Sequence, residues 1–159
     1  MAGTIVKSGT NRTISLYLTD VPSSSYTIGQ VAVTAATDLL GHCKSMQFPE
    51  PSSDDIDVTD WDSEAKEYEN GMIDFGEANS VRNLTSDEYE GAMDLAQAGT
   101  KKILTVTVKN KAGTEIIKRQ GECTVKAPSV ANTEVDGVLE VTTTYKMSGT
   151  FAKFTGTVS

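Results

Sequence analysis

The chain has 159 residues, of which 38% are hydrophobic and 23% are charged, which is typical of a single soluble globular domain and argues against disorder. We expect one domain spanning residues 1–159, with a flexible N-terminal arm at residues 1–12 and another flexible segment at residues 127–137. The formal net charge is −8. Such an acidic chain is not expected to bind a polyanion through its phosphates, because that binding needs clustered Lys and Arg side chains.

Alternation of apolar and polar residues predicts that strands dominate the fold. The alternation is clear in TISLYL (residues 13–18), YTIGQVAVT (26–34), ILTVTVK (103–109) and VLEVTTTYKM (138–147). In the second of these the phase changes at Gly29 and Gln30, which predicts a bulge or bend. KNKAGTE (109–115) is typical of a hairpin turn, with Gly113 at a position that tolerates positive φ.

One segment instead predicts an amphipathic helix over residues 86–98. Thr85 and Glu88 have the spacing of a capping box, acidic residues fill the first turn, and Gly99 follows at the C′ position. The residues on one side of this helix are expected to pack on a sheet, and they are Tyr89, Met93 and Ala96.

Residues 35–55 carry no sustained period and contain Gly41, two prolines and a Ser-Ser-Asp-Asp end. They predict a long, partly extended loop, in which a helical turn near residues 36–42 is possible. The expected fold is therefore mainly β, an antiparallel β-sandwich or barrel with one short α-helix (86–98) and one long loop (35–55).

The sequence predicts no enzyme. His42 is the only histidine, and its neighbour Cys43 points to the opposite face of an extended chain, so the two do not form a catalytic dyad. No nucleophile-elbow, phosphate-loop or zinc-protease motif is present. A glycosidase using paired carboxylates remains an alternative, although a sugar cleft is usually lined by aromatic residues, which form only 6% of this chain.

Cysteines and targeting signals give no further site. Cys43 and Cys123 lie 80 residues apart, outside any CxxC pair and without a histidine at metal-ligand spacing, so we expect two buried free thiols and no zinc. No cofactor is expected. The N-terminal residues lack the apolar core of a secretory signal, and no run of 18 apolar residues is present, so we expect synthesis in a host cytoplasm without membrane insertion.

The stretch DVTDWDSEAKEYENGMIDFG (residues 57–76) holds seven acidic residues and the only tryptophan, Trp61. Asp60, Asp62 and Glu64 have the spacing that begins a calcium-binding EF-hand loop. The motif then fails, because Ala65 and Gly71 occupy the positions that need glycine and a bidentate glutamate. A calcium site of another type stays open, beside the alternative of a strand end followed by a solvated acidic turn.

Taken together, these motifs resemble the signature region of siphophage major tail tube proteins. In that family a strand ending in D-V-T leads through a turn with AKEY to a G-[LM]-x-D-x-G step, and this chain has DVT (57–59), AKEY (65–68) and GMIDFG (71–76). The order of elements is also similar: early strands, a long loop, the signature, one helix, a hairpin, and a closing strand with an S-G step at Ser148 and Gly149. The resemblance covers roughly residues 12–156. The C-terminal immunoglobulin-like domain of many such proteins is not expected here.

The resemblance implies a structural virion protein of a phage tail. Such proteins form hexameric rings that stack into a hollow tube, with strands around the lumen, helices outside, and a long loop, an N-terminal arm and a C-terminal end that reach neighbouring rings. The tube surrounds a tape-measure protein, joins baseplate and terminator proteins, and later conducts DNA without specific binding. The alternatives are a type VI secretion tube, another ring-forming baseplate or terminator component, or a β-sandwich carbohydrate-binding module.

The candidate site of this chain is accordingly an assembly interface, without catalytic, metal or cofactor-binding residues. We expect subunit or ring-stacking contacts at the apolar residues of the long loop and at the signature. These residues are Leu39, Leu40, Met46, Phe48, Asp57, Thr59, Asp60, Trp61, Lys66 and Tyr68.

Overall fold

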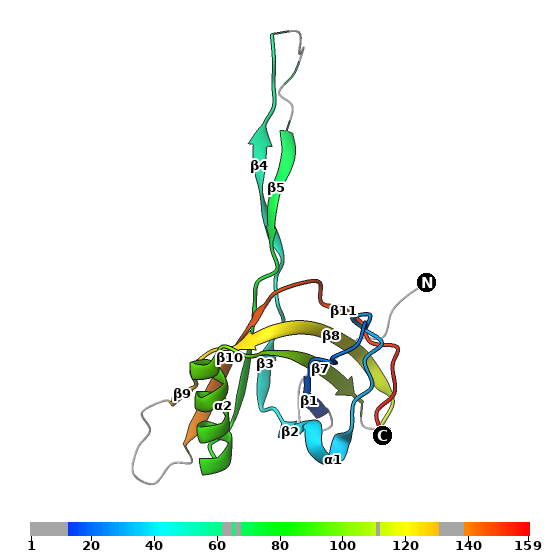
Figure 1. Cartoon of the computed structure of the whole chain (residues 1–159), viewed down its shortest axis with the longest axis vertical. Helices are drawn as coiled ribbons and strands as arrows, with labels where there is room; N and C mark the ends of the chain where they lie inside the picture. Colours follow the sequence, from blue (N-terminus) through cyan, green and yellow to red (C-terminus); the bar gives the residue numbers. More distant parts are fainter. Residues whose placement is uncertain (1–12, 62–64, 66–67, 111, 131–138) are drawn as a thin grey trace.

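A computed structural model describes residues 13–61, 65, 68–110, 112–130 and 139–159. It shows an antiparallel, mainly β body from which one hairpin projects (Figure 1). The elements in chain order are β1 (Thr13–Asp20), α1 (Ala35–Asp38), β2 (Leu39–His42), β3 (Ser45–Gln47), β4 (Ser52–Asp57), β5 (Tyr68–Asp74), β6 (Glu77–Asn83), α2 (Ser86–Ala98), β7 (Lys101–Lys109), β8 (Glu115–Val125), β9 (Ser129–Val130), β10 (Glu140–Met147) and β11 (Ala152–Lys153). Within these described ranges, no helix has the length and apolar character needed to cross a membrane.

The main sheet curls into a barrel whose two edges are joined by one stretch of chain. Its strands follow the order β2-β1-β7-β8-β10-β6-β3, with β11 beside β8 and β9 beside β10. β2 and β3 lie at opposite edges, yet only Cys43 and Lys44 separate them in sequence. The N–H of Cys43 donates to the carbonyl of Ile14 on β1 (2.9 Å), and the N–H of Lys44 donates to the carbonyl of Val81 on β6 (2.8 Å). The sheet therefore closes on itself, which removes the long exposed edges of an open sheet.

The interior of the barrel holds the main hydrophobic core. Alternate residues of β10 are buried, as its period of two predicts: Val141, Tyr145 and Met147 are at most 3% exposed. The buried cluster consists of Leu16, Ala78, Leu104, Val106, Cys123, Val125, Tyr145 and Met147. The helix α2 adds Ala92 and Leu95 to this cluster from one side.

A second layer covers the outer face of β1, β7 and β8. Val33 and Phe154 pack there against Tyr17, and β7 is consequently buried on both faces, including Thr105 and Thr107. The side chain of Gln120, on β8, holds this layer against the sheet through hydrogen bonds. It accepts hydrogen bonds from the N–H groups of Gly29 (2.8 Å) and Val31 (3.2 Å), and it donates to the Val31 carbonyl (3.0 Å) and the Thr105 hydroxyl (2.9 Å).

The predicted helix and hairpin turn are confirmed. α2 begins after Thr85, whose hydroxyl accepts from the Glu88 N–H (3.3 Å), and it ends at Gly99 with a φ of +64°. β7 and β8 pair along their length, and Gly113 in the turn between them has a φ of +84°. Both segments are predictable because the residues that define them, the capping and turn residues, lie close together in the sequence.

Two predicted segments differ from the structure. Residues 26–33 form no strand of their own; the bend at Gly29 is confirmed (φ +97°), but the chain after it is held by the Gln120 side chain and by residues 157–159. Residues 35–55 are more regular than a loop, because they form α1, β2, β3 and the start of β4. Strands of three or four residues are too short to show a period, so only their pairing partners define them.

Candidate assembly surface

A two-stranded hairpin projects from one end of the barrel, and we call its described residues, 50–61, 65 and 68–74, the β4–β5 hairpin (Figure 1). Its strands pair with each other, from Ser52 opposite Asp74 to Asp57 opposite Tyr68, in a sheet separate from the barrel. A hairpin of two strands has no core of its own and is marginally stable at best in water. This element therefore needs a further partner to bury its side chains.

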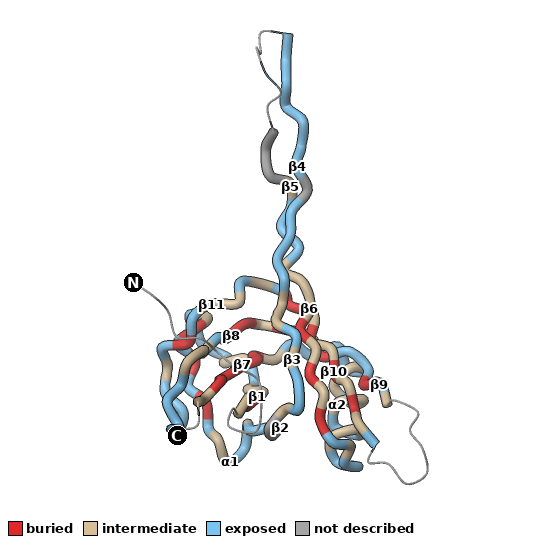
Figure 2. The backbone as a smooth tube through the Cα atoms, turned by 180° about the vertical axis from the view of Figure 1, so that it is seen from behind, coloured by how far each residue is buried: buried red, intermediate tan, exposed pale blue. Residues whose placement is uncertain are grey.

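Large apolar side chains of the β4–β5 hairpin face solvent. Trp61 is 103% exposed and Met72 is 95% exposed, while Ile73 and Ile56 are 56% and 51% exposed. Figure 2 shows the described hairpin as almost entirely exposed, whereas the buried residues lie in the barrel. Exposed apolar side chains gathered on one element are a mark of an interaction surface.

The β4–β5 hairpin also concentrates the charge of the chain. Residues 50–74 contain ten of the 22 acidic residues and one of the 14 basic residues, a formal charge of −9. Since the whole chain has a formal charge of −8, the rest of it carries +1. Seven of these ten acidic residues, and no Lys or Arg, are among the residues of this stretch that the structure describes, so much of the acidity of the protein belongs to one projecting element.

A compact turn ends β4. The Oδ1 atom of Asp57 accepts a hydrogen bond from the backbone N–H of Thr59 at 3.0 Å. The Thr59 hydroxyl and this N–H hold the pKa of Asp57 below its usual value. The turn contact is therefore fully present above the ordinary pKa of an aspartate, and it is lost as the pH falls through the lowered value.

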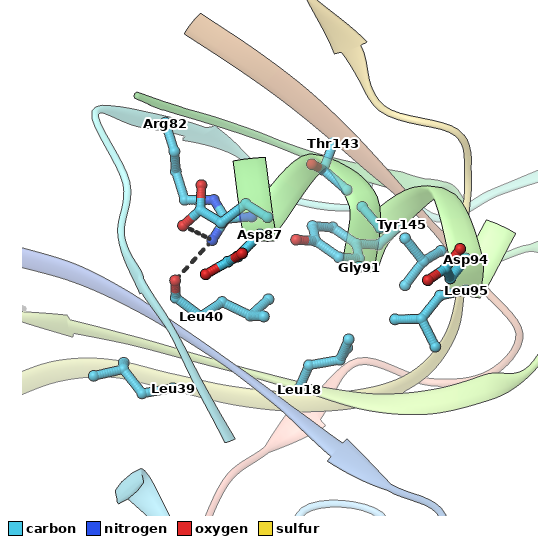
Figure 3. Close-up of a pocket in the computed structure, with 13 residues that line it drawn as sticks. Leu18, Leu39, Leu40, Arg82, Asp87, Gly91, Asp94, Leu95, Thr143 and Tyr145 are labelled. Carbon is cyan, nitrogen blue, oxygen red and sulfur yellow. Dashed lines mark hydrogen bonds and ion pairs between the residues drawn. The ribbon is translucent and has the colours of Figure 1, made fainter. Parts of the chain in front are cut away.

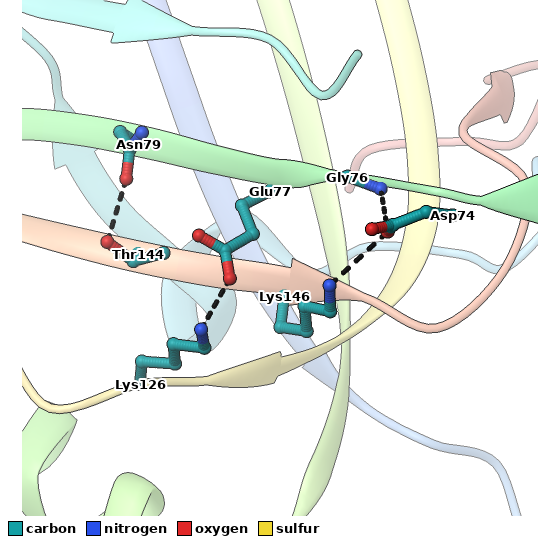
Figure 4. Close-up of polar contacts among 7 residues, drawn as sticks. All are labelled: Asp74, Gly76, Glu77, Asn79, Lys126, Thr144 and Lys146. Carbon is teal, nitrogen blue, oxygen red and sulfur yellow. Dashed lines mark hydrogen bonds and ion pairs between the residues drawn. The ribbon is translucent and has the colours of Figure 1, made fainter. Parts of the chain in front are cut away.

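At the base of the β4–β5 hairpin, Asp74 connects the hairpin to the barrel (Figure 4). Its Oδ1 atom accepts from the N–H of Gly76 (2.9 Å) and from the Lys146 ammonium of β10 (3.3 Å). These two donors, the Gly76 N–H first, lower the pKa of Asp74. Gly76 has a φ of +80°, and a Cβ at this position would lie 2.8 Å from the carbonyl oxygen of Glu50, two residues before β4.

The substitution Gly76→Ala is expected to destabilise the folded protein by about 2–4 kcal/mol, because a left-handed backbone costs roughly 1–2 kcal/mol and the clash with a backbone atom adds a similar amount. Urea unfolding followed by circular dichroism measures the change. Gly113→Ala is the matched control: its φ is +84°, but nothing lies within 4 Å of the added Cβ. Equal losses for the two variants would show that the close approach of Glu50 contributes nothing.

The outer face of β6 and β10 is polar, and its lysines are paired (Figure 4). Lys126 forms an ion pair with Glu77, and Lys146 forms an ion pair with Asp74. The Thr144 hydroxyl donates a hydrogen bond to the side-chain oxygen of Asn79 at 2.7 Å. At the far end of β10, Lys44 and Glu140 form an ion pair of 2.9 Å. We call this surface, with Thr142, the β6–β10 polar face; every described lysine on it has a carboxylate partner.

A pocket of about 500 Å³ lies between α2 and the sheet (Figure 3). Its walls are largely apolar and include Leu39 and Leu95. Arg82 is buried at one end, where its Nη1 atom donates to the carbonyl of Leu40 (2.9 Å) and to Oε1 of Glu88 (3.1 Å). The ion pair thus joins Arg82 Nη1 to Glu88 Oε1, while Arg82 Nε and Glu88 Oε2 are buried without a hydrogen-bond partner among the described residues.

The described residues contain no group of three or more His, Cys, Asp or Glu side chains that could hold a metal ion. Asp62 and Glu64 of the calcium alternative lie outside these residues. Both cysteines are free thiols; Cys123 is buried in the core and Cys43 is half-buried. Burial raises the pKa of the Cys43 thiol to about 11, against a partial lowering by Arg82, and raises that of Cys123 to about 12.

Both thiols are expected to resist alkylation by iodoacetamide at neutral pH in the folded protein and to react fully in urea, because the reactive thiolate is suppressed on the order of a hundredfold or more. Mass spectrometry counts the labels. Since both folded pKa values are raised, the folded state keeps protons that the unfolded state loses. The contribution of the two thiols to stability is therefore constant below the ordinary thiol pKa and is lost as the pH rises towards 11 and 12. Rapid native labelling of Cys123 would contradict this assignment.

The predicted interface residues fall into two regions of the structure. In the first, Leu39 is 41% exposed, while Leu40, Met46 and Phe48 are half-buried and pack against the core of their own chain. In the second, Asp57, Thr59, Asp60 and Trp61 are exposed at and beyond the end of β4. Tyr68 is the first residue of β5, but the position of its side chain is not described. Lys66 is not among the described residues. Their roles in subunit contacts stay predictions.

The helix presents a slightly different side to the barrel than its sequence predicts. Tyr89, Met93 and Ala96 are half-buried, but the α2 residues that pack against the core cluster are Ala92 and Leu95. Two further features are not predicted from the sequence. One is that the hairpin projects as a single unit, and the other is the exposed pair of cations on the barrel, Arg119 and Lys153. The concentration of ten acidic residues within 50–74 was the available signal for the hairpin.

No family model matches the sequence, and no curated protein matches it significantly. Solved structures do match the fold. A chain of the anti-feeding prophage baseplate, 6-fold symmetrised, aligns with a TM-score of 0.63 and 7% identity over 98% of this chain and 99% of that chain. The sheath/tube terminator of the extracellular contractile injection system PVC, in its extended state, aligns with a TM-score of 0.61 and 11% identity over 93% and 96%.

The tail tube of SPP1 aligns with a TM-score of 0.51 and 10% identity over 87% of this chain and 75% of that chain. At these identities the likeness establishes the fold and no more. The expected tail-tube-like fold is confirmed, while membership in the siphophage family stays a prediction. The barrel with its projecting hairpin thus has the fold found in tail tube, tube terminator and baseplate assemblies.

Proposed function

We propose that this protein is a structural subunit of a phage tail or a related injection machine, in which hexameric rings stack into a hollow tube. The observation that carries the proposal is the β4–β5 hairpin, an exposed apolar and acidic element whose strands form a sheet separate from the barrel. It stands on a barrel whose fold occurs in tube, terminator and baseplate assemblies. Such a hairpin becomes a buried element when it lies against another copy.

The β6–β10 polar face is proposed to line the lumen, with α2 on the outside of the tube. Its lysines Lys44, Lys126 and Lys146 are each paired with a carboxylate, so they offer phosphates little attraction. Viral DNA would pass such a wall without being held, and a tape-measure protein would occupy the same lumen during assembly. The protein would act in the virion, joined at the tube ends to baseplate and terminator proteins, and it would have no enzymatic role.

Size-exclusion chromatography with light scattering tests the proposal. As the concentration of purified protein rises, the mass is expected to step from the 17.0 kDa chain to a ring and then to larger multiples of that ring. A monomer at every concentration and salt condition would contradict the proposal. A monomer that binds oligosaccharide or calcium would instead support the carbohydrate-binding alternative.

A component at the end of the tube is the second candidate. The observation that favours it is coverage: the baseplate and terminator chains align over 99% and 96% of their length, against 75% for the SPP1 tail tube. An end component would form one ring and stop, whereas a tube subunit would continue to elongate. The largest mass reached in light scattering separates the two.

A further inference from the structure

The barrel carries Lys and Arg side chains that have no ion-pair partner among the described residues. Seven described Lys and Arg side chains form ion pairs with carboxylates. Lys109, Arg119 and Lys153 form no ion pair with any described carboxylate. Two of these three, Arg119 and Lys153, lie together.

Arg119 on β8 and Lys153 on β11 are directly opposite each other in the ladder, and both are exposed. Residues in this relation have neighbouring side chains on one face of a sheet. The Arg119 Nη1 atom donates to the carbonyl of Phe151 at 3.3 Å, which holds the guanidinium at the surface. We call Arg119 and Lys153 the basic pair.

The basic pair lies at the same end of the barrel as the base of the β4–β5 hairpin. The ring of Phe151, next to the basic pair, lies 6.4 Å from the ring of Phe48, two residues before the hairpin begins at Glu50. Figure 1 shows β11 at that end, with the β4–β5 hairpin pointing away from the barrel. The hairpin therefore leads away from the basic pair of its own chain.

The length of the β4–β5 hairpin suits a contact with the next copy. β4 has six residues, Ser52–Asp57, which at about 3.3 Å per residue span about 20 Å. The described chain continues outward beyond β4 (Figure 1), so the hairpin reaches a length comparable to the diameter of a small domain, about 30 Å. A hairpin from one copy can thus cross a second copy stacked on it and reach the end at which that copy carries its own basic pair.

We propose that the β4–β5 hairpin of one copy docks along a second copy of this chain, with its carboxylates against the basic pair and its exposed apolar side chains buried in the contact. This rests on the proposed ring-stacking function and names the partner surface for it. Trp61, Met72 and Ile73 supply the apolar area, and Asp55 and Asp60 are exposed acidic residues of the outer part. Each copy offers both surfaces, so the contact repeats from ring to ring.

Charge selects the second copy over other occupants. Two hairpins placed side by side would repel each other, because the described residues of each include seven acidic and no basic side chains. A nucleic acid is repelled by the same charge. The rest of the chain carries +1, and its exposed unpaired cations lie where a stacked copy would bring the hairpin. Complementary potentials of this kind mainly set the register and the rate of association.

The test compares four full-length chains by the concentration at which light scattering shows assembly. The first is the natural chain, and the second is a pair variant, Arg119→Glu with Lys153→Glu. The third is a control with the same charge change, Lys101→Glu with Lys109→Glu. The fourth is a swap variant, which adds Asp55→Lys and Asp60→Lys to the pair variant. Circular dichroism checks that each chain is folded. Where the pair variant fails to fold, Arg119→Gln with Lys153→Gln replaces it.

The pair variant is expected to need an assembly concentration on the order of tenfold higher or more. The control should change it by less than about threefold, and the swap variant should recover much of the loss. Salt of about 0.5 M should weaken assembly of the natural chain far more than that of the pair variant, because it screens exposed charges. If the natural chain and the pair variant assemble equally, the docking is wrong although the ring-stacking function stands; a natural chain that never assembles contradicts both.

Discussion

The substitution Gln120→Leu is expected to destabilise the protein by on the order of 3–6 kcal/mol, because it removes a side chain that satisfies three backbone groups at a buried site. Gln120 is 0% exposed and bonds the N–H groups of Gly29 and Val31 and the carbonyl of Val31. Leucine fills similar space but leaves these groups unsatisfied, at about 1–3 kcal/mol each. The loss is a large part of a typical folding free energy of about 5–15 kcal/mol.

Urea denaturation measures this loss, and a fall in the midpoint of thermal unfolding of roughly 10–20 °C should accompany it. Thr107→Val is the matched control on the same face of the sheet. The Thr107 hydroxyl is buried without a hydrogen-bond partner among the described residues, so its removal should leave stability unchanged or raise it. A loss below about 1 kcal/mol for Gln120→Leu would mean that the covering layer is held by apolar packing alone.

Removal of the β4–β5 hairpin is expected to abolish stacking while the barrel stays folded. Because Ser52 and Asp74 are partners in the ladder, an Asn-Gly turn can replace residues 53–73 and keep the Asp74 contacts to Gly76 and Lys146. The hairpin forms a sheet of its own, so its loss should shift the unfolding midpoint of the barrel by only a few degrees. Light scattering should find no species beyond a single ring.

A second variant separates the apolar from the acidic contribution of the hairpin. Trp61→Ser with Met72→Ser keeps its length and charge while removing its two most exposed large apolar side chains. It should assemble more weakly than the natural chain, because the apolar area available for burial is smaller. Tubes of normal length from the chain that lacks residues 53–73 would show that stacking depends on other surfaces.

Much of the fold was predictable from local sequence. The α2 helix, with Thr85 and Gly99 at its ends, and the β7–β8 hairpin with Gly113 have signals that lie within a few residues of each other. The closure of the barrel was not predictable, since β2 and β3 have three or four residues and are defined by β1 and β6, which are distant in sequence. A period of two cannot be read in such short strands.

The candidate site was only partly predictable for a related reason. The acidic stretch from Asp57 to Gly76 is distinctive in the sequence, and the structure places its described residues up to Asp74 in the projecting hairpin. The basic pair could not be found, because Arg119 and Lys153 become neighbours only through the β8–β11 ladder. Likewise Leu40, Met46 and Phe48 pack against the core of their own chain while staying half-buried, so their role in an interface stays a prediction. Apolar composition does not distinguish an interior from an interface.

Electron cryomicroscopy of the concentrated protein tests the central claim most directly. The account predicts hollow rings with sixfold symmetry that stack along their axis, with the β4–β5 hairpin of each copy lying against a copy in the adjacent ring and the β6–β10 polar face on the lumen. Separate monomers at every concentration, or rings whose hairpins point into solvent and touch no neighbouring copy, would contradict it.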